Sequence, residues 1–190
     1  HKGHERRLDV RSEGDVIVLE STLDGAEKPD SVERMRVTSE GTLVSESSLT
    51  RSKKVITEFV PDLLVFPVSL EPKTPVVTKN EFLVHPMSDP KKVKDRGKAT
   101  QTITLVGLEH VKLSEGTVDA AHVRTVLMMD CGGGTGERTT DQWFAIDPKD
   151  GGASSLVAES YDEIIKVMGI QTERDTGTMR AIEHPKTAKK

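Results

Sequence analysis

Apolar and polar residues alternate with a period of two through much of this chain, most clearly over residues 120–129. One side of an extended chain would carry Ala121, Val123, Leu127 and Met129, with Thr125 among them. The other side would carry His122 and Arg124, followed by Val126 and Met128. Side chains alternate between the two faces of a β-strand, so the pattern predicts a strand with one apolar and one mixed face. A helix is the competing prediction, because 120–129 contains no helix breaker.

Turn residues separate further segments of this kind. The tripeptide Ser-Glu-Gly occurs at 12–14, 39–41 and 114–116, each time between segments that contain Val or Leu. Glycine adopts the positive φ that tight hairpin turns need. We therefore expect a meander of hairpins. Its strands before the central one are predicted over residues 7–11, 15–22, 32–38, 42–49, 53–60 and 102–113.

Two segments depart from this simple pattern. Residues 61–75 contain four prolines around an apolar run, and proline cannot donate a hydrogen bond to a sheet, so we expect an irregular or edge segment there. Residues 163–174 suit either a short helix that begins at Asp162 or a strand. We favour a strand that pairs with 179–183 through a turn at Asp175-Thr176-Gly177, because glycine lies at the turn and Ile and Val are frequent.

Composition narrows the class of protein. The 190 residues suit one β domain over 1–190, with 1–4 and 184–190 expected to be frayed. Charged residues make up 31% of the chain and the net charge is −4, which gives no overall attraction to nucleic acid or to an anionic membrane. Aromatic residues are only 3%, too few for base-stacking surfaces. No apolar run approaches the roughly 20 residues of a transmembrane helix.

Three runs in the second half of the chain resemble a known pattern. They are Glu115-Gly-Thr-Val-Asp-Ala-Ala-His-Val-Arg124, Thr139-Thr-Asp-Gln-Trp-Phe-Ala145 and Gly151-Gly-Ala-Ser-Ser-Leu-Val157. They are similar to bacterial secreted and envelope domains of uncharacterised function, which carry a small-Gly-Thr-x-x-Ala-x-x-Val strand followed by a Thr-x-x-Trp-Phe-Ala strand. That family loosely resembles periplasmic lipoprotein carriers. The resemblance implies an antiparallel meander sheet curved into a half-barrel or open barrel. It also implies a periplasmic or extracellular location, with a lipid anchor on the precursor as one option.

Residues that could support catalysis form no recognised motif. Gly132–Gly136 is glycine-rich, but a phosphate loop needs a helix after the glycines, and strand-like residues follow here. We therefore favour a flexible hairpin. Cys131 is the one cysteine, and it is expected to behave as a small hydrophobic residue rather than as a nucleophile. The basic segment 91–98 lacks interleaved aromatics and is expected to be a solvated loop.

A histidine-based enzyme or metal site is the less favoured alternative. It would combine His110 and His122 with Asp119 or Glu109 across paired strands. The chain lacks His-x-His, His-Glu-x-x-His and Cys-x-x-Cys spacing, whereas structural metal sites usually show closely spaced ligands. We therefore predict no catalytic residue, no metal and no cofactor.

An apolar surface is the remaining candidate for function. One face of an antiparallel sheet can stay open, and apolar clefts are common ligand sites. The residues expected to line such a cleft are Leu63, Leu64, Phe66, Val126 and Met128, although they would equally serve an ordinary core. The prediction is a non-enzymatic extracytoplasmic envelope protein that binds a lipid, another apolar ligand or an envelope protein. The alternative is a structural or assembly protein without a small ligand.

Overall fold

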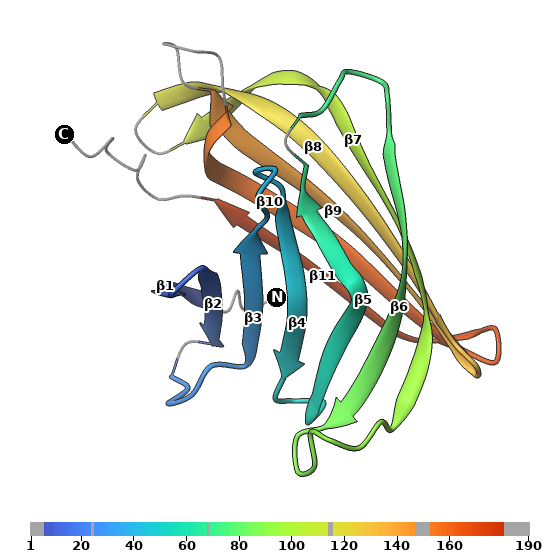
Figure 1. Cartoon of the computed structure of the whole chain (residues 1–190). Helices are drawn as coiled ribbons and strands as arrows, with labels where there is room; N and C mark the ends of the chain where they lie inside the picture. The colour runs from blue at the N-terminus through green and yellow to red at the C-terminus, as the bar shows by residue number, and fades with distance from the viewer. Residues whose placement is uncertain (1–5, 24, 68, 114–115, 147–152, 181–190) are drawn as a thin grey trace. The chain divides into compact units, whose positions relative to one another are not determined.

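The structure is a computed structural model, and it describes residues 6–23, 25–67, 69–113, 116–146 and 153–180. All regular secondary structure in these residues is β-strand, and the order of the strands in the sheet is their order in the sequence (Figure 1). The predicted mainly-β class and the single antiparallel meander are therefore confirmed. The strands are β1 (Arg6–Glu13), β2 (Val16–Leu23), β3 (Ser31–Val37), β4 (Leu43–Thr50), β5 (Val55–Phe66), β6 (Val76–Pro86), β7 (Asp95–Leu113), β8 (Gly116–Cys131), β9 (Gly134–Ile146), β10 (Ala153–Val167) and β11 (Ile170–Arg180).

The chain forms two compact units. Unit 1 comprises His1–Ser69 and Thr78–Ala99, and unit 2 comprises Leu70–Val77 and Thr100–Lys190. Strands β1 to β5 and most of β6 belong to unit 1, whereas most of β7 and all of β8 to β11 belong to unit 2. The single domain expected from the sequence stays a prediction.

Unit 1 begins with the hairpins that the Ser-Glu-Gly turns predict. Gly14 has a φ of +68° between β1 and β2, and Gly41 has a φ of +82° between β3 and β4. These left-handed values strain any residue with a Cβ, which explains why glycine occupies both turns. Ser114 and Glu115 of the third tripeptide lie outside the described residues. Among the described residues of unit 1, the buried hydrophobic ones are Val18, Met35, Val44, Phe59, Leu63, Phe82 and Ala99.

The proline-containing segment is more regular than the sequence suggested. Strand β5 continues through Pro61 to Phe66, and Leu63 lies opposite Ser45 of β4. The register between β4 and β5 shifts between Ser45 and Ser47, and this irregularity contains Pro61. The buried side chain of Asn80 donates to the backbone carbonyls of Pro61 at 2.7 Å and Asp62 at 3.2 Å. The expected irregular segment is therefore a strand whose bulge accommodates the proline, because a side chain from β6 satisfies the freed carbonyls.

The central strands of unit 2 pair as predicted. The competing prediction of a helix over 120–129 is therefore wrong. Ala120 of β8 lies opposite Ala145 of β9, and both are buried. They form a core cluster with Leu113 and Val157, against which Val111, Val118 and Trp143 pack. The expectation of one apolar and one mixed face is only partly correct. Ala120 and His122 are buried on one face of β8, and Val123 is buried on the other.

The C-terminal hairpin exists, but its predicted turn is wrong. Strand β10 ends at Val167 and β11 starts at Ile170, so the turn is Met168-Gly169, with φ values of +51° and +80°. Gly177 instead lies within β11, opposite Tyr161 of β10, and a Cβ at this position would overlap the tyrosine ring. This glycine therefore makes room for a cross-strand aromatic side chain and does not form a turn. The two ends that are expected to be frayed, 1–4 and 184–190, lie outside the described residues.

Candidate functional site

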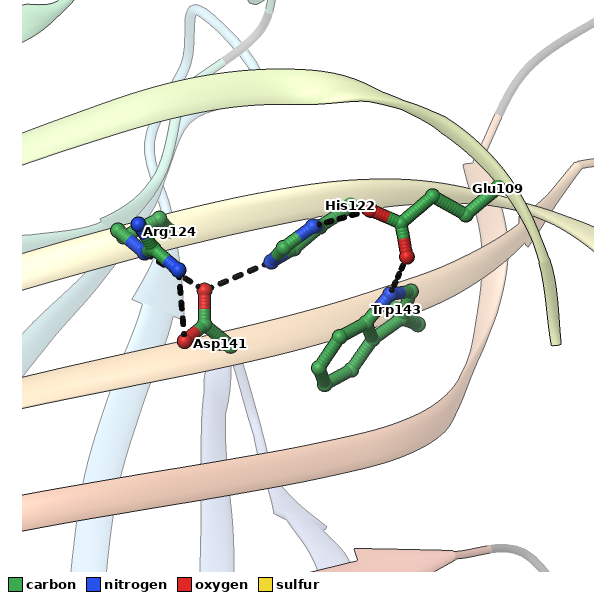
Figure 2. A network of polar contacts seen from close by, with 5 residues as sticks. All are labelled: Glu109, His122, Arg124, Asp141 and Trp143. Carbon is green, nitrogen blue, oxygen red and sulfur yellow. Dashed lines mark hydrogen bonds and ion pairs between the residues drawn. The ribbon is translucent and has the colours of Figure 1, made fainter.

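Five polar and aromatic side chains from three neighbouring strands of unit 2 form one connected network (Figure 2). In the β8–β9 register, His122 lies opposite Trp143 and Arg124 lies opposite Asp141. Residues two apart in a strand share a face, so these four side chains lie on the same side of the sheet. Glu109 of β7 completes the network. We call this set the five-residue network; its members are Glu109, His122, Arg124, Asp141 and Trp143.

His122 lies at the centre of the five-residue network. Only 6% of the residue is exposed. Its Nδ1 lies 2.8 Å from Oε1 of Glu109, and its Nε2 lies 2.7 Å from Oδ1 of Asp141. A neutral imidazole has one ring nitrogen without a proton, which would face carboxylate lone pairs here. The geometry therefore fits an imidazolium that donates a hydrogen bond to each carboxylate.

Trp143 contacts both Glu109 and the imidazole of His122. Its Nε1 donates to Oε2 of Glu109 at 2.8 Å. The indole also stacks on His122, with ring centroids 4.5 Å apart and an angle of 20° between the planes. Both carboxylate oxygens of Glu109 are thus hydrogen-bonded. The face of the Trp143 indole lies against the His122 imidazole, and an aromatic face favours a positively charged neighbour.

The charges in the network alternate in sign. Arg124 donates to Asp141 through Nε at 2.8 Å and through Nη2 at 3.3 Å. Hydrogen bonds from Trp143 and His122 lower the pKa of the Glu109 carboxyl. Burial acts to raise the pKa of the Asp141 carboxyl, but hydrogen bonds from Arg124 and His122 outweigh it, so this pKa is also lowered. Two cations and two anions therefore stabilise one another, and the network has no net charge in its fully ionised form.

The contacts within the network occupy the groups of His122 that could act on another molecule. A general base needs a ring nitrogen within reach of a substrate proton, and both nitrogens of His122 are hydrogen-bonded within the protein. Within the described ranges, no three His, Cys, Asp or Glu side chains form a group that could hold a metal ion. The five-residue network fixes the register of β7, β8 and β9 on one face.

Acid is expected to weaken this network. Both carboxylates have a lower pKa in the folded chain than in the unfolded chain, so the unfolded state binds more protons as the pH falls. The stabilisation is complete above the unfolded values, about 4 for both groups, and it is lost as the pH falls through the lower folded values. Unfolding in urea, followed by circular dichroism between pH 7 and pH 3, should show this decline, and a Glu109→Gln/Asp141→Asn variant should show a shallower one. An equally steep decline in the variant would contradict the prediction that these two carboxylates contribute to the loss of stability in acid.

The histidine site considered from the sequence does not assemble. His110 pairs with Asp119 at 2.6 Å, and both side chains are exposed, at 81% and 72%. Because neighbouring residues in a strand point to opposite faces, this pair lies on the opposite face from Glu109 and His122. Two of the contacts considered are therefore present, His110 with Asp119 and His122 with Glu109, but they lie on opposite faces of the sheet.

The other chemical candidates form local contacts. Gly132 and Gly133 form the turn between Cys131 and Gly134, so the predicted hairpin is confirmed. The half-buried Cys131 has its Sγ 3.6 Å from the carbonyl oxygen of Gly134. The basic residues at positions 91, 92, 94, 96 and 98 are exposed as expected. The predicted loop over 91–98 is only partly correct, because β7 begins at Asp95.

The residues of the predicted apolar cleft are distributed over two units. Leu63 is buried, and Leu64 and Phe66 are half-buried, in β5 of unit 1. Val126 is half-buried and Met128 is 55% exposed in β8 of unit 2. Leu63, Leu64 and Phe66 pair with β4, whereas Val126 and Met128 pair with Thr139 and Glu137 of β9. A ligand site that uses both sets stays a prediction.

Sequence reasoning missed an exposed apolar hairpin end. Met168, in the turn between β10 and β11, is 89% exposed, and the flanking Val167 and Ile170 are 46% and 71% exposed. We call these three residues the apolar tip. The amide of Met168 donates to the carbonyl of Gly133 at 3.1 Å, so the β8–β9 and β10–β11 turns lie side by side (Figure 1). The signal in the sequence was Met168-Gly169 between two β-branched residues.

No helix in the described part of the chain is long and apolar enough to cross a membrane. Comparisons with protein-family models, with curated proteins and with solved structures give no match for this chain. The similarity to envelope domains therefore stays a prediction that depends on the sequence of three runs, 115–124, 139–145 and 151–157.

Proposed function

We propose that this chain is a non-enzymatic binding module of the bacterial envelope, and that it uses the apolar tip to contact an apolar ligand or the apolar surface of a partner. The observation that carries this proposal is the exposure of Met168, Val167 and Ile170 at one hairpin end. Apolar groups that cluster on a surface commonly mark interaction sites, whereas single exposed ones need no explanation.

The conformation of Met168 supports the same proposal. Its φ of +51° lies in the left-handed region, which Asn or Gly occupies with less strain. A methionine at this position adds backbone strain and leaves a flexible apolar side chain in water. Folding gains nothing evident from this choice, so a role in binding is the simplest physical reason for it. The location in the envelope is supported by the sequence resemblance alone.

A double variant of the apolar tip tests the proposal. Met168→Asn/Ile170→Thr should leave the chain folded, since both side chains are largely exposed and Asn tolerates a positive φ. Binding to palmitate or to phosphatidylcholine vesicles, measured by isothermal titration calorimetry and by co-sedimentation, should weaken about tenfold or more, because burying each apolar side chain contributes roughly 1.5–3 kcal/mol. Val37→Asn, at a half-exposed position of β3 in unit 1, is the matched control. No binding by the natural chain would remove the lipid-ligand version of the proposal.

An assembly role is the second candidate, favoured by the ends of the sheet. β1 and β11 each have only one neighbour among the described strands, so each presents an edge that can pair with another chain. Light scattering over a range of protein concentrations separates the two candidates. A stable homo-oligomer that also forms in the Met168→Asn/Ile170→Thr variant would favour assembly through an edge.

A further inference from the structure

A second candidate site lies in unit 1 and is independent of the proposed function. It is an open cleft of about 300 Å³. The register places Ser47 opposite Glu58, and Ile56 opposite His85. These four side chains therefore lie on one face of β4, β5 and β6. The lining residues are Glu46, Ser47, Ile56, Glu58, His85 and Pro90.

His85 is the unusual residue in this cleft. It is only 8% exposed, and both of its ring nitrogens are buried without a hydrogen-bond partner among the described residues. Nε2 lies 3.3 Å from Oε2 of Glu58, within ion-pair distance but without the alignment of a hydrogen bond. Buried polar groups are almost always hydrogen-bonded, because an unmet bond is costly. The imidazole therefore lacks a partner, and it forms part of the wall of the cleft.

The charges around the cleft indicate what kind of partner fits. Arg36 pairs with Glu46 at 3.1 Å and with Asp62 at 2.6 Å, so one guanidinium serves two carboxylates. Glu58 contributes a third carboxylate, and no cation other than a protonated His85 pairs with it in the described part of the chain. Of the residues that line the cleft, Glu46 and Glu58 carry carboxylates and none is a lysine or arginine. A ligand that enters the cleft is therefore favoured if it is a cation.

We propose that this cleft binds a primary ammonium group. An ammonium has three N–H donors, and three acceptors of two kinds belong to residues that line the cleft: the carboxylates of Glu46 and Glu58, and an unpaired nitrogen of His85. Ile56 and Pro90 provide apolar contacts for the carbon chain that carries the ammonium. A metal ion fits less well, since no three His, Cys, Asp or Glu side chains among the described residues are placed so that they could hold one together.

Titration with small cations, followed through the ring signals of His85 by NMR, tests this assignment. n-Butylammonium should shift the His85 signals and bind at least tenfold more tightly than n-butyltrimethylammonium, which has the same charge but no N–H donor. Glu58→Gln should weaken butylammonium binding about tenfold or more, because a hydrogen bond to a charged acceptor is lost. Glu40→Gln, at an exposed turn position, should leave binding unchanged.

His85→Phe keeps the ring and removes both nitrogens, so it tests the role of the imidazole. Thermal unfolding establishes that the variant is folded, and butylammonium binding, read from backbone amide shifts of Glu58, should then be lost. Three further probes separate the possible sources of the ammonium: 1,5-diaminopentane, Nα-acetyl-lysine amide and phosphoethanolamine. The tightest of these identifies the class of natural ligand.

Three results would overturn the proposal. The first is equal binding of butylammonium and its trimethyl analogue, which would show that the N–H donors are not recognised. The second is a shift of the His85 signals on adding Zn²⁺ but not on adding butylammonium. The third is a shift of the His85 signals in Lys91→Gln or Lys92→Gln without any added amine, which would show that the neighbouring loop fills the cleft itself.

Discussion

Replacing Asp141 with alanine is expected to lower the free energy of unfolding by about 3 kcal/mol. The Asp141 side chain is only 17% exposed, and it accepts hydrogen bonds from His122 Nε2 at 2.7 Å and from Arg124 Nε at 2.8 Å. Its removal leaves a buried ring nitrogen without an acceptor and a guanidinium without its anion. Loss of one partner from a buried charged pair costs far more than loss of an exposed contact.

The chain provides a matched control for this prediction. Asp119 of β8 also contacts a histidine, because its Oδ1 lies 2.6 Å from Nδ1 of His110 in β7. Both of these side chains are exposed. Asp119→Ala should therefore change the free energy of unfolding by less than about 0.5 kcal/mol. Urea denaturation of both variants at neutral pH measures the difference. Equal effects of the two substitutions would contradict the buried and connected character of the five-residue network.

Ile103→Ala is expected to have an effect of similar size, about 3 kcal/mol, for a different reason. Ile103 of β7 is 1% exposed and is one of the largest fully buried side chains among the described residues. Truncation removes apolar surface that is buried on folding and leaves a cavity that the surrounding strands fill only in part. Leu108→Ala on the same strand is the control, because Leu108 is 72% exposed. Its effect should stay within about 0.5 kcal/mol.

Thermal and urea unfolding of the Ile103 and Leu108 variants give the measurement. A small effect of Ile103→Ala would mean that this part of β7 collapses around the shortened side chain. A large effect of Leu108→Ala would mean that its exposed face is covered by another molecule in solution, such as a second copy of the chain.

Much of the fold could be predicted because alternation and turns are local properties. The period of two over 120–129 and the glycines at positions 14 and 41 depend only on a few neighbouring residues. The C-terminal turn was misplaced because Gly177 meets the local rule for a turn, while its actual role depends on Tyr161, which pairs with it across the strands. The role of a glycine that accommodates a distant side chain cannot be read from its own neighbours.

The five-residue network was only partly predictable. Glu109 and His122 were considered together as a metal site, but Trp143, Asp141 and Arg124 were not connected with them. The missing information was the register between β8 and β9. A two-residue turn at Gly132-Gly133 places His122 opposite Trp143 and Arg124 opposite Asp141. Had that turn been assigned to these two glycines, the pairing of four of the five residues would have followed.

The sequential order of the strands has a consequence for how the chain acquires its structure. Each described strand neighbours only the strands next to it along the chain, and closing a short connection costs little conformational entropy. Folding slows when distant segments must meet first, and this topology imposes no such requirement between its first and last strands. We therefore expect rapid folding for an all-β protein, in which each hairpin can join the growing sheet as it emerges during synthesis.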